Sequence, residues 1–255
     1  MGEPGVRRVE HVMGIPVGID VRDEGVGENA LDAAFEVLRR VDAMFSTYRP
    51  ASEISRLGAG TLSLDKASPE VRAVLTRCER LRAETGGAFD VRATGVLDPS
   101  GFVKGWAVEK AAAVLRDRGV WRLCIHAGGD VRVCGGRAPG LPWRVGVQHP
   151  HVRDRVAAVL PVLDAAVATS GAYERGEHIV DPRSDRPPEG VLSVTVVGPD
   201  LGTADAYATA AFAMGLGGPA WTAGLDGYEA MTILADGRVL STPGLAVDQD
   251  AISAV

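Results

Sequence analysis

Hydrophobic positions change their spacing several times along the first part of the chain, and each change marks a new element. Residues 9–21 are rich in Val and Ile but are broken by two glycines and a proline, which is typical of a strand with a kink. Apolar residues then recur three and four positions apart from Asn29, a capping residue, to about Phe45, and predict a helix. A second helix is predicted from Ser68, which is followed by a proline at the first helical position, to about Thr85.

The middle of the chain combines one more helix with short strands. A loop, LDPSGFVKG, precedes a helical pattern from Trp106 to Arg118, which Gly119 ends. Three strand-like runs follow, WRLCIHAGG, DVRVCGG and WRVGVQ. The gaps between these runs are short and rich in glycine, which predicts a series of hairpins.

The last part of the chain continues this mixture. Residues 157–169 and 192–198 have the pattern of strands. Thr203 can cap a helix that runs through Met214, and YEAMTILADGRVLSTPG predicts a final hairpin. Helices and antiparallel strands are mixed without strict alternation, which favours an α+β fold. No low-complexity linker and no repeat divides the chain, so we expect a single domain over residues 1–255.

Composition and charge restrict the class of protein. The 255 residues include 46% hydrophobic and 24% charged side chains, the balance of a globular protein with a sizeable core. The net charge of −6, from 27 basic and 33 acidic side chains, argues against nucleic acid as a main partner, because phosphate binding requires clustered Lys and Arg. Three cysteines without a CxxC pair predict neither a disulfide framework nor a zinc site. We find no signal peptide, no lipid attachment site and no run near the roughly 18 apolar residues of a membrane span, and expect a cytoplasmic protein without a transmembrane segment.

One pair of side chains on the last predicted helix has the spacing of a metal site. Asp205 and Thr209 are four residues apart, so a helix places both side-chain oxygens on one face. A carboxylate and a hydroxyl suit a hard cation such as Mg²⁺. The alternative is an Asp near the positive end of a helix and a Thr that bonds to a backbone carbonyl. The pair by itself does not decide between the two.

Three other stretches carry groups that could bind a ligand, and each has an ordinary structural alternative. HAGGD, from His126 to Asp130, has glycines that allow close approach to a ligand, but it also suits a tight hairpin turn. Lys104, at the expected mouth of a helix, could meet a phosphate or be an exposed first-turn residue. His178, in a loop rich in glycine and polar residues, could be a general base or a surface residue. The chain has no Walker A sequence and no GxGxxG followed by a helix, so the common nucleotide-binding folds are not supported.

The order of several segments between Met13 and Gly215 is more specific than any one of them. The segments are MGIPV, FSTYRPASEISRL, TGGAFDV, VKGWAVEKAA, IHAGGDV, WRVGVQHP, ATSGAYER, HIVDPRSDRP and ADAYATAAFAMG. With these segments in this order, the chain resembles the ApbE family, the FAD:protein FMN transferases. The resemblance implies an α+β fold with mixed, largely antiparallel sheets and packed helices, in which FAD lies between two lobes. It also implies transfer of FMN from FAD to a Thr or Ser hydroxyl of a partner protein, with release of AMP.

The resemblance further implies roles for single residues. Asp205 and Thr209 resemble ligands of Mg²⁺, with a backbone carbonyl near Gly105 as a third ligand. His178 would activate the incoming hydroxyl or position the phosphate, and Asp181 would orient that loop or hold Mg²⁺ through water. The flavin, phosphate and adenosine parts of FAD would be bound by residues from the same segments, namely Ser46, Tyr48, Ala88, Phe89, Asp90, Lys104, Gly128, Gly129, Asp130, Thr169, Ser170, Gly171 and Tyr173.

The chain departs from the pattern of the family at three places. His126 stands where Asn is usual, so we expect an imidazole in place of a ligand-facing amide. Ser184 and Asp185 replace the usual Thr-Gly after Asp-Pro and add a carboxylate near an anionic site. Gly58 follows SEISRL where a polar residue is common. These departures bear on substrate preference more than on fold.

Three functions are open at this point. The first is transfer of FMN to a protein, and the second is Mg²⁺-dependent hydrolysis of FAD to FMN and AMP, which replaces the hydroxyl by water. An acceptor domain with a segment like Asp-x-x-(Thr/Ser)-(Gly/Ser)-Ala-Thr would distinguish the first from the second. The third is a flavin-binding carrier without turnover, which would be yellow but indifferent to metal. The presence of Asp205, Thr209, His178 and Asp181 favours an enzyme.

Overall fold

The computed structural model describes residues 5–152, 154–171 and 179–248. At its centre is an eight-stranded sheet in the order β1-β2-β3-β4-β7-β8-β9-β10, in which neighbouring strands are antiparallel. The strands of this sheet are β1 (Val6–Val12), β2 (Ile15–Val21), β3 (Leu123–Ala127), β4 (Asp130–Cys134), β7 (Ala166–Gly171), β8 (Val191–Gly198), β9 (Glu229–Leu234) and β10 (Val239–Ser241). A separate two-stranded sheet pairs β5 (Trp143–Gln148) with β6 (Val156–Val162).

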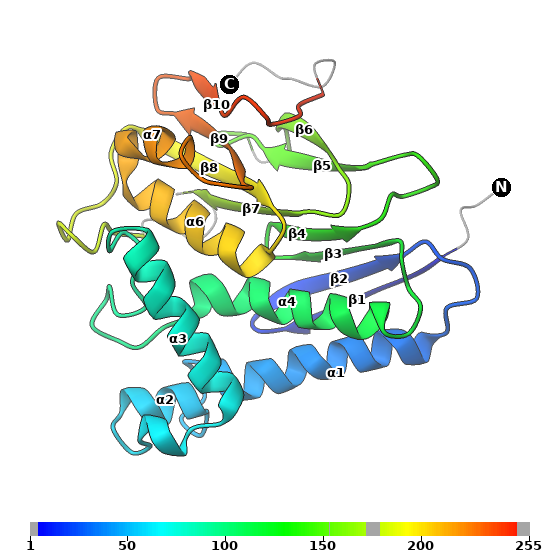
Figure 1. Cartoon of the computed structure of the whole chain (residues 1–255), viewed down its shortest axis with the longest axis horizontal. Helices are drawn as coiled ribbons and strands as arrows, with labels where there is room; N and C mark the ends of the chain where they lie inside the picture. The colour runs from blue at the N-terminus through cyan, green and yellow to red at the C-terminus, as the bar shows by residue number, and fades with distance from the viewer. Residues whose placement is uncertain (1–4, 153, 172–178, 249–255) are drawn as a thin grey trace.

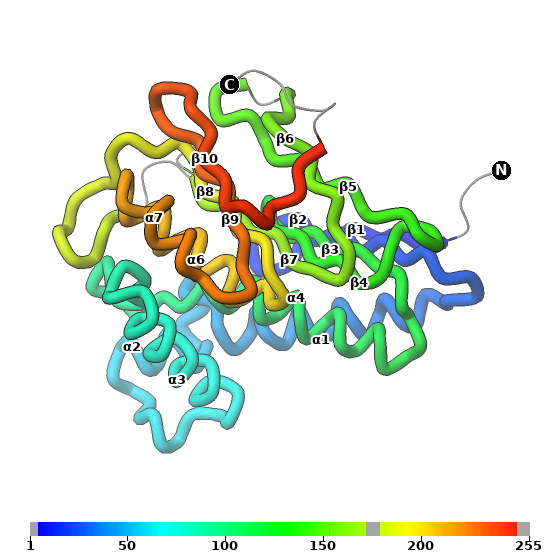
Figure 2. The backbone as a smooth tube through the Cα atoms, turned by 45° about the horizontal axis from the view of Figure 1, so that its top comes forward, coloured from blue at the N-terminus to red at the C-terminus, as the bar shows by residue number. Residues whose placement is uncertain are grey.

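Helices cover one face of the large sheet, and the small sheet covers part of the other (Figures 1 and 2). The helices against the sheet are α1 (Glu28–Phe45), α4 (Ser100–Arg116) and α6 (Leu201–Ala213), with the short α7 (Gly218–Thr222) after α6. On the opposite face, the β5–β6 hairpin buries a second apolar cluster that includes Val133, Leu160 and Met231. The helices α2 (Glu53–Gly58) and α3 (Pro69–Glu84) form a corner that projects from the helical layer (Figure 1). The predicted α+β class is therefore confirmed.

The kinked strand expected at residues 9–21 is two strands joined by a tight turn. β1 and β2 pair from Val6 opposite Val21 to Val12 opposite Ile15. Met13 and Gly14 form the turn with φ values of 56° and 72°. Two consecutive residues with positive φ are the geometry of hairpin turns that match the twist of the strands. The sequence obscured this turn because Met is uncommon in that region of backbone space.

Two predicted helix caps lie elsewhere. α1 begins after Gly27 rather than at Asn29, and Gly27 makes no side-chain cap bond. α6 begins after Asp200, whose carboxylate accepts a hydrogen bond from the backbone N–H of Thr203 at 2.7 Å. Thr203 is thus the residue that is capped, not the cap. The predicted cap Ser68 is confirmed for α3, since its hydroxyl oxygen accepts from the N–H of Val71 at 3.3 Å.

α4 starts at Ser100, six residues before the predicted start at Trp106. Glycine disfavours helix interiors, which is why VKGW suggested a loop. The structure shows what Gly105 does instead: a Cβ atom there would lie 2.6 Å from both the carbonyl oxygen of Leu201 and the backbone nitrogen of Gly202. The backbones of α4 and α6 therefore cross in direct contact at Gly105. This crossing brings the side chains of one helix to those of the other.

The predicted hairpin at HAGGD is confirmed. The prediction that WRVGVQ continues this series of hairpins is wrong. β3 and β4 pair directly, and Gly128 and Gly129 turn the chain with φ values of 54° and 90°. WRVGVQ, however, forms β5 and leaves the large sheet to pair with β6. The free side of β4 is taken by β7, with Val131 opposite Val167.

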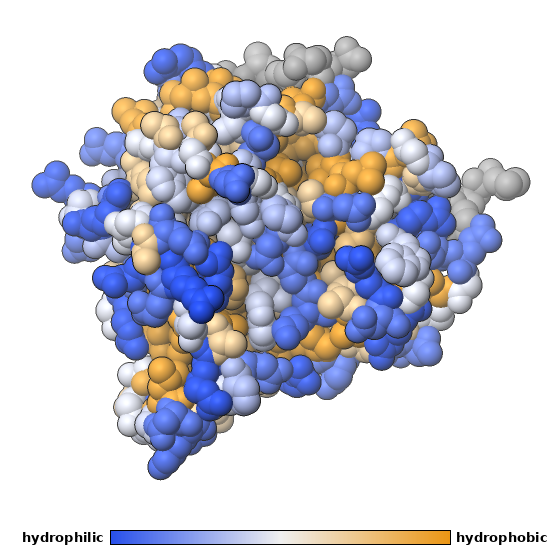
Figure 3. Space-filling model, viewed as in Figure 1, coloured by the Kyte–Doolittle hydropathy of each residue, from blue (hydrophilic) through white to orange (hydrophobic). Residues whose placement is uncertain are grey.

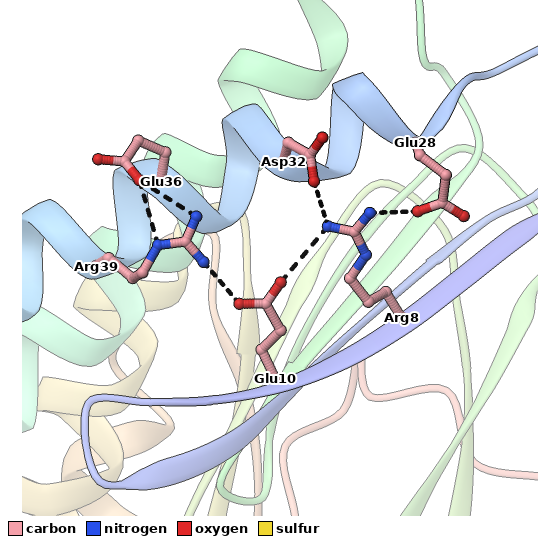
Figure 4. Close-up of polar contacts among 6 residues, drawn as sticks. All are labelled: Arg8, Glu10, Glu28, Asp32, Glu36 and Arg39. Carbon is pink, nitrogen blue, oxygen red and sulfur yellow. Dashed lines mark hydrogen bonds and ion pairs between the residues drawn. The ribbon is translucent and has the colours of Figure 1, made fainter.

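A chain of ion pairs joins α1 to the edge strand β1 (Figure 4). Arg8 of β1 contacts Asp32 at 2.6 Å and also pairs with Glu28, while Glu10 of β1 contacts Arg39 at 2.7 Å. The carboxylates of Glu28 and Asp32 are more than 60% exposed, so each pair contributes modestly. Together the pairs connect α1 to β1 at two places along the strand.

The surface drawn in Figure 3 is mostly hydrophilic, with hydrophobic areas between the polar ones, including the corner that α2 and α3 form. Across residues 5–152, 154–171 and 179–248, no helix is both long enough and apolar enough to cross a bilayer.

Candidate functional site

A cavity of about 600 Å³ opens between the helical layer and the end of β7. Its size lies within the range of sites for cofactors and other small molecules. Segments from very different parts of the chain line it: the β1–β2 turn, the end of α1, residues 88–91, 93–94 and 98, the start of α4, the end of β7, residues 179, 180 and 182, and α6. The wall is therefore assembled by tertiary packing and not by one local motif.

A buried cluster of charges lies at the α4–α6 side of this cavity. The ammonium nitrogen of Lys104 is 2.8 Å from Oδ2 of Asp130 and 3.6 Å from Oδ2 of Asp205. Asp130 has no exposed surface, and Asp205 is 3% exposed. Lys104 and Asp205 line the cavity, whereas Asp130 lies beneath them on β4. Two carboxylates and one ammonium group leave the cluster with a formal charge of −1, which suits an additional cation.

Asp130 joins the strands to the helices. Burial raises the pKa of its carboxyl, and the Lys104 ammonium together with the N–H of Thr169, a donor at 3.3 Å, counteracts that effect. Its contacts thus reach α4 and β7 from β4. Glu109 makes a similar link one turn further along α4, since it pairs with Arg132 of β4 at 2.9 Å and accepts from the N–H of Leu201 at 2.9 Å.

Side-chain oxygen atoms that could bind a metal ion lie next to the charge cluster. Asp205 and Thr209 lie on the same face of α6 and both line the cavity. The hydroxyl of Thr209 is 3.3 Å from that of Ser170 at the end of β7. Gly101 of α4 lies beside it, because a Cβ atom there would be 3.7 Å from the Thr209 hydroxyl oxygen. Gly101 rather than Gly105 is thus the α4 glycine that reaches the cavity.

These donors have the chemistry that Mg²⁺ prefers. Among the described residues, no group of three or more His, Cys, Asp or Glu side chains could hold a metal ion. Mg²⁺ commonly uses one or two carboxylates and completes its shell with water and phosphate oxygens. Asp205, with the Thr209 hydroxyl beside it, fits that smaller requirement.

Asp181 points its carboxylate at an arginine. Arg183 forms two bonds of 2.8 Å with it, and this contact holds the pKa of Asp181 below its usual value. The neighbouring residues Ile179, Val180 and Pro182 line the cavity, but Asp181 does not. His178 and Tyr173 lie outside the described residues.

Most of the residues expected at the site do line this one cavity. They are Ser46, Tyr48, Ala88, Phe89, Asp90, Lys104, Thr169, Ser170, Gly171, Asp205 and Thr209. Gly105, Gly128, Gly129 and Asp130 do not, because the first lies in the helix crossing, the next two form the β3–β4 turn and the last is buried under Lys104. Asp90 lines the cavity but is also bound by Arg82 at 2.8 Å.

The expectation that His126 faces the ligand is wrong. Its imidazole lies on the face of the sheet opposite the helices, over Gly18 of β2, where an added Cβ atom would be 1.9 Å from Nε2. Burial and the charge of Arg7 lower the pKa of His126. The side chain alternates with Ile125 and Ala127, which are buried on the helical face. The period of two along β3 could have revealed this orientation.

Some lining residues were not anticipated from sequence, including Met13, Ile15, Asp98 and Gly101. Asp98 had a local signal, because an Asp two residues before Ser100 can accept its backbone N–H, as it does here at 3.0 Å. Met13 and Ile15 reach the cavity because the β1–β2 turn ends there, which depends on the whole sheet.

Comparison with known proteins gives one consistent result. The model of the ApbE family matches residues 13–98 and 91–232. An FAD:protein FMN transferase of Vibrio cholerae is 30% identical over 238 residues, which cover 70% of this chain and 71% of the relative. A second FAD:protein FMN transferase, from Rhodobacter capsulatus, is 34% identical over 61% of this chain but only 31% of its own length. The solved flavin transferase ApbE from Vibrio cholerae superposes with a TM-score of 0.82 at 25% identity, over 94% of this chain and 98% of that structure. The ApbE protein from Thermotoga maritima, at 23% identity and a TM-score of 0.78, shares the fold.

Proposed function

The chain belongs to the ApbE family, and from this premise we propose that it transfers the FMN part of FAD to a Thr or Ser hydroxyl of a partner protein and releases AMP. The names of its relatives support flavin transfer. One observation of the structure carries the assignment: Lys104, Asp205 and Thr209 meet at one side of a cavity of about 600 Å³. Lys104, together with a cation held by Asp205 and Thr209, would offset the charge of an anionic pyrophosphate at this oxygen-rich site.

Lys104 would bind a phosphate oxygen of FAD from the α4 side. Its ammonium group carries three donors, and Asp130 at 2.8 Å holds it in place. Ser170 would donate from β7. Asp205 and Thr209 would hold Mg²⁺, whose charge would offset the negative charge on the departing AMP. Because these residues come from packed helices and a central strand, the phosphates would be held in a fixed orientation.

The reaction that this site would perform is a displacement at phosphorus. The acceptor hydroxyl oxygen forms a bond to the phosphorus of the FMN half. The bond from that phosphorus to the bridging oxygen breaks, and AMP leaves with that oxygen. The hydroxyl proton passes to a base. Asp181 is a weak candidate for this base because Arg183 lowers its pKa, so we assign it the orientation of the loop and assign the proton to His178.

The test follows AMP release and covalent flavin together. The full chain would be incubated with FAD and a recombinant domain that bears the segment Asp-x-x-Thr-Gly-Ala-Thr, with and without Mg²⁺. Asp205→Ala is the site variant, and Asp226→Ala, which removes an exposed carboxylate of the turn before β9, is its matched control. The proposal requires both products to depend on Mg²⁺ and Asp205 but not on Asp226.

Other outcomes identify the alternatives. AMP release without flavin on the domain, whether or not its Thr is present, would indicate hydrolysis of FAD. Tight FAD binding with no AMP under any condition would contradict both enzyme functions and leave a flavin carrier.

A further inference from the structure

A second cavity lies directly beside the first. It has a volume of about 440 Å³ and is bounded by α2 on one side and by Arg92 and residues 95–97 on the other. Thr47 lines both cavities, and its neighbour Tyr48, which lines the larger one, is 95% exposed. The two cavities are therefore contiguous at the segment between α1 and α2. We call the second cavity the α2 groove.

The α2 groove has an apolar floor and an open rim. Ile54 and Leu97 form the floor, with exposures of 0% and 4%. Val96 stands on the rim and is 61% exposed, which adds apolar surface to the floor. Figure 3 shows hydrophobic surface at the same corner of the molecule. An open groove of this shape suits a length of polypeptide more than a compact ligand.

Each wall of the α2 groove contains a glycine, whose missing side chain leaves space in the groove. Gly58 ends α2, and Gly95 turns the opposite wall with a φ of 78°. A Cβ atom at Gly58 would be 3.7 Å from the Cβ of Leu97, an ordinary contact, so a side chain would be tolerated there and would project into the groove. Its absence leaves room for another backbone to approach. This gives a structural meaning to Gly58, which departs from the polar residue common at this place.

A positively charged side chain, that of Arg92, lies at the edge of the α2 groove. Arg92 lines it and is exposed, and its guanidinium has no ion-pair partner within the described part of the chain. The arginines nearby are different: Arg49 is bound to Asp42 at 2.6 Å, and Arg82 to Asp90 at 2.8 Å. In a protein with a net charge of −6, an unpaired arginine beside an apolar groove favours an acidic residue on the partner.

We propose that the α2 groove binds the flavin-acceptor protein, as an extended segment near the acceptor hydroxyl that places apolar or small residues over Ile54 and Leu97 and a carboxylate against Arg92. This inference rests on the proposed function, because only a transferase has a protein as its second substrate. The contiguity at Thr47 lets one segment reach from the groove into the larger cavity. Arg92 attracts an acidic residue of the partner, and Ile54 and Leu97 make apolar contacts with it.

The experiment separates binding of the acceptor from chemistry on FAD. Two variants act on the groove in different ways: Arg92→Glu reverses its charge, and Gly58→Gln fills it. Neither residue lines the larger cavity. Flavin transfer is measured against the concentration of the recombinant domain bearing Asp-x-x-Thr-Gly-Ala-Thr, and FAD affinity is measured by flavin fluorescence. We expect each variant to raise KM for the domain roughly fivefold to tenfold, with kcat and FAD affinity close to wild type.

Controls and a rescue make the result specific. Arg118→Glu makes the same charge change at an exposed arginine beyond the far end of α4 and should leave KM unchanged. The acidic residues of the acceptor domain are changed to Lys one at a time, and one of these should restore the KM of Arg92→Glu. Raised salt should weaken acceptor binding by the wild type more than by Arg92→Glu.

Two results would overturn the proposal, and they differ. If wild type transfers FMN but Arg92→Glu and Gly58→Gln keep its KM for the domain, the acceptor binds elsewhere and the proposed function stands. If wild type releases no AMP and labels no domain, the proposed function fails and the groove proposal fails with it.

Discussion

The ammonium nitrogen of Lys104 lies 2.8 Å from a carboxylate oxygen of Asp130, a residue with no exposed surface. The two residues belong to different layers, since Lys104 lies on α4 and Asp130 on β4. Sequence similarity placed Asp130 among residues that touch FAD. The structure instead makes it the support of a residue that lines the cavity.

We therefore expect the two side chains to be strongly coupled in stability. Lys104→Met leaves the Asp130 carboxylate buried without this partner and should destabilise the protein by about 3 kcal/mol. The double variant Lys104→Met, Asp130→Asn should be less destabilised than Lys104→Met, because it removes the buried charge as well. Urea unfolding of the wild type, both single variants and the double variant gives the coupling. Simple additivity of the two single effects would contradict it.

The helix crossing predicts an unusual response to alanine. Gly105→Ala improves helix propensity by about 1 kcal/mol, yet its Cβ would lie 2.6 Å from the backbone of α6. We expect a net loss of about 2 kcal/mol in the free energy of unfolding, since backbone cannot yield as a flexible side chain does. FAD affinity should fall as well, because the displaced helices carry Lys104 and Asp205. Gly58→Ala is the matched control, as its Cβ has room; equal effects of the two substitutions would refute the argument.

Asp185 offers a stabilising substitution. Its φ of 56° lies in the left-handed region, which Asp tolerates at a cost that Gly does not have. We expect Asp185→Gly to stabilise the protein by up to about 1 kcal/mol, detected as a rise in Tm. Asp226→Gly changes an exposed Asp with negative φ, so the same substitution there should lower Tm instead. A fall in Tm for Asp185→Gly would show that the turn needs the carboxylate.

The pair of Asp181 and Arg183 predicts a dependence on pH. Hydrogen bonding by Arg183 lowers the pKa of Asp181 in the folded protein, so the pair stabilises it above the unfolded pKa of about 4 and the effect is lost as pH falls through the lower folded value. Arg183 is 42% exposed, so the effect should be below about 1 kcal/mol. Unfolding of wild type and Arg183→Gln should differ by that amount at pH 7 and converge near pH 2. A difference that grows towards low pH would have the wrong sign.

Local patterns predicted the parts of the fold that local interactions decide. Ser68 and the proline after it fixed the start of α3, and the glycines after Ala127 fixed a hairpin turn, because caps and turns depend on a few neighbouring residues. The resemblance to a family supplied most of the cavity lining. Residues that act through distant contacts escaped both approaches. Gly105 was expected to contribute a carbonyl, but its lack of a side chain serves the contact with Gly202, nearly a hundred residues away.

The same limit applies to His126 and Asp181. The family pattern gave each a position, but not the direction of its side chain. His126 points away from the cavity because it alternates with buried residues of β3, and Asp181 is occupied by an arginine two residues further on. Orientation and partners depend on the strand register and the turn, which the structure supplies.

The pairing of β2 with β3 has a consequence for how the protein forms. Val17 is opposite Ala127, so the whole segment from α1 to α4 is the connection between these two neighbouring strands, and its ends must meet before the centre of the sheet can close. Closing so long a loop is slow, since its entropy is lost before the contacts that reward it are made. The β1–β2 hairpin can form early, but the cavity needs residues from Met13 to Thr209 and becomes complete only with the last of these steps. A growing chain on the ribosome would therefore gain its ligand site late and all at once, after α6 has emerged.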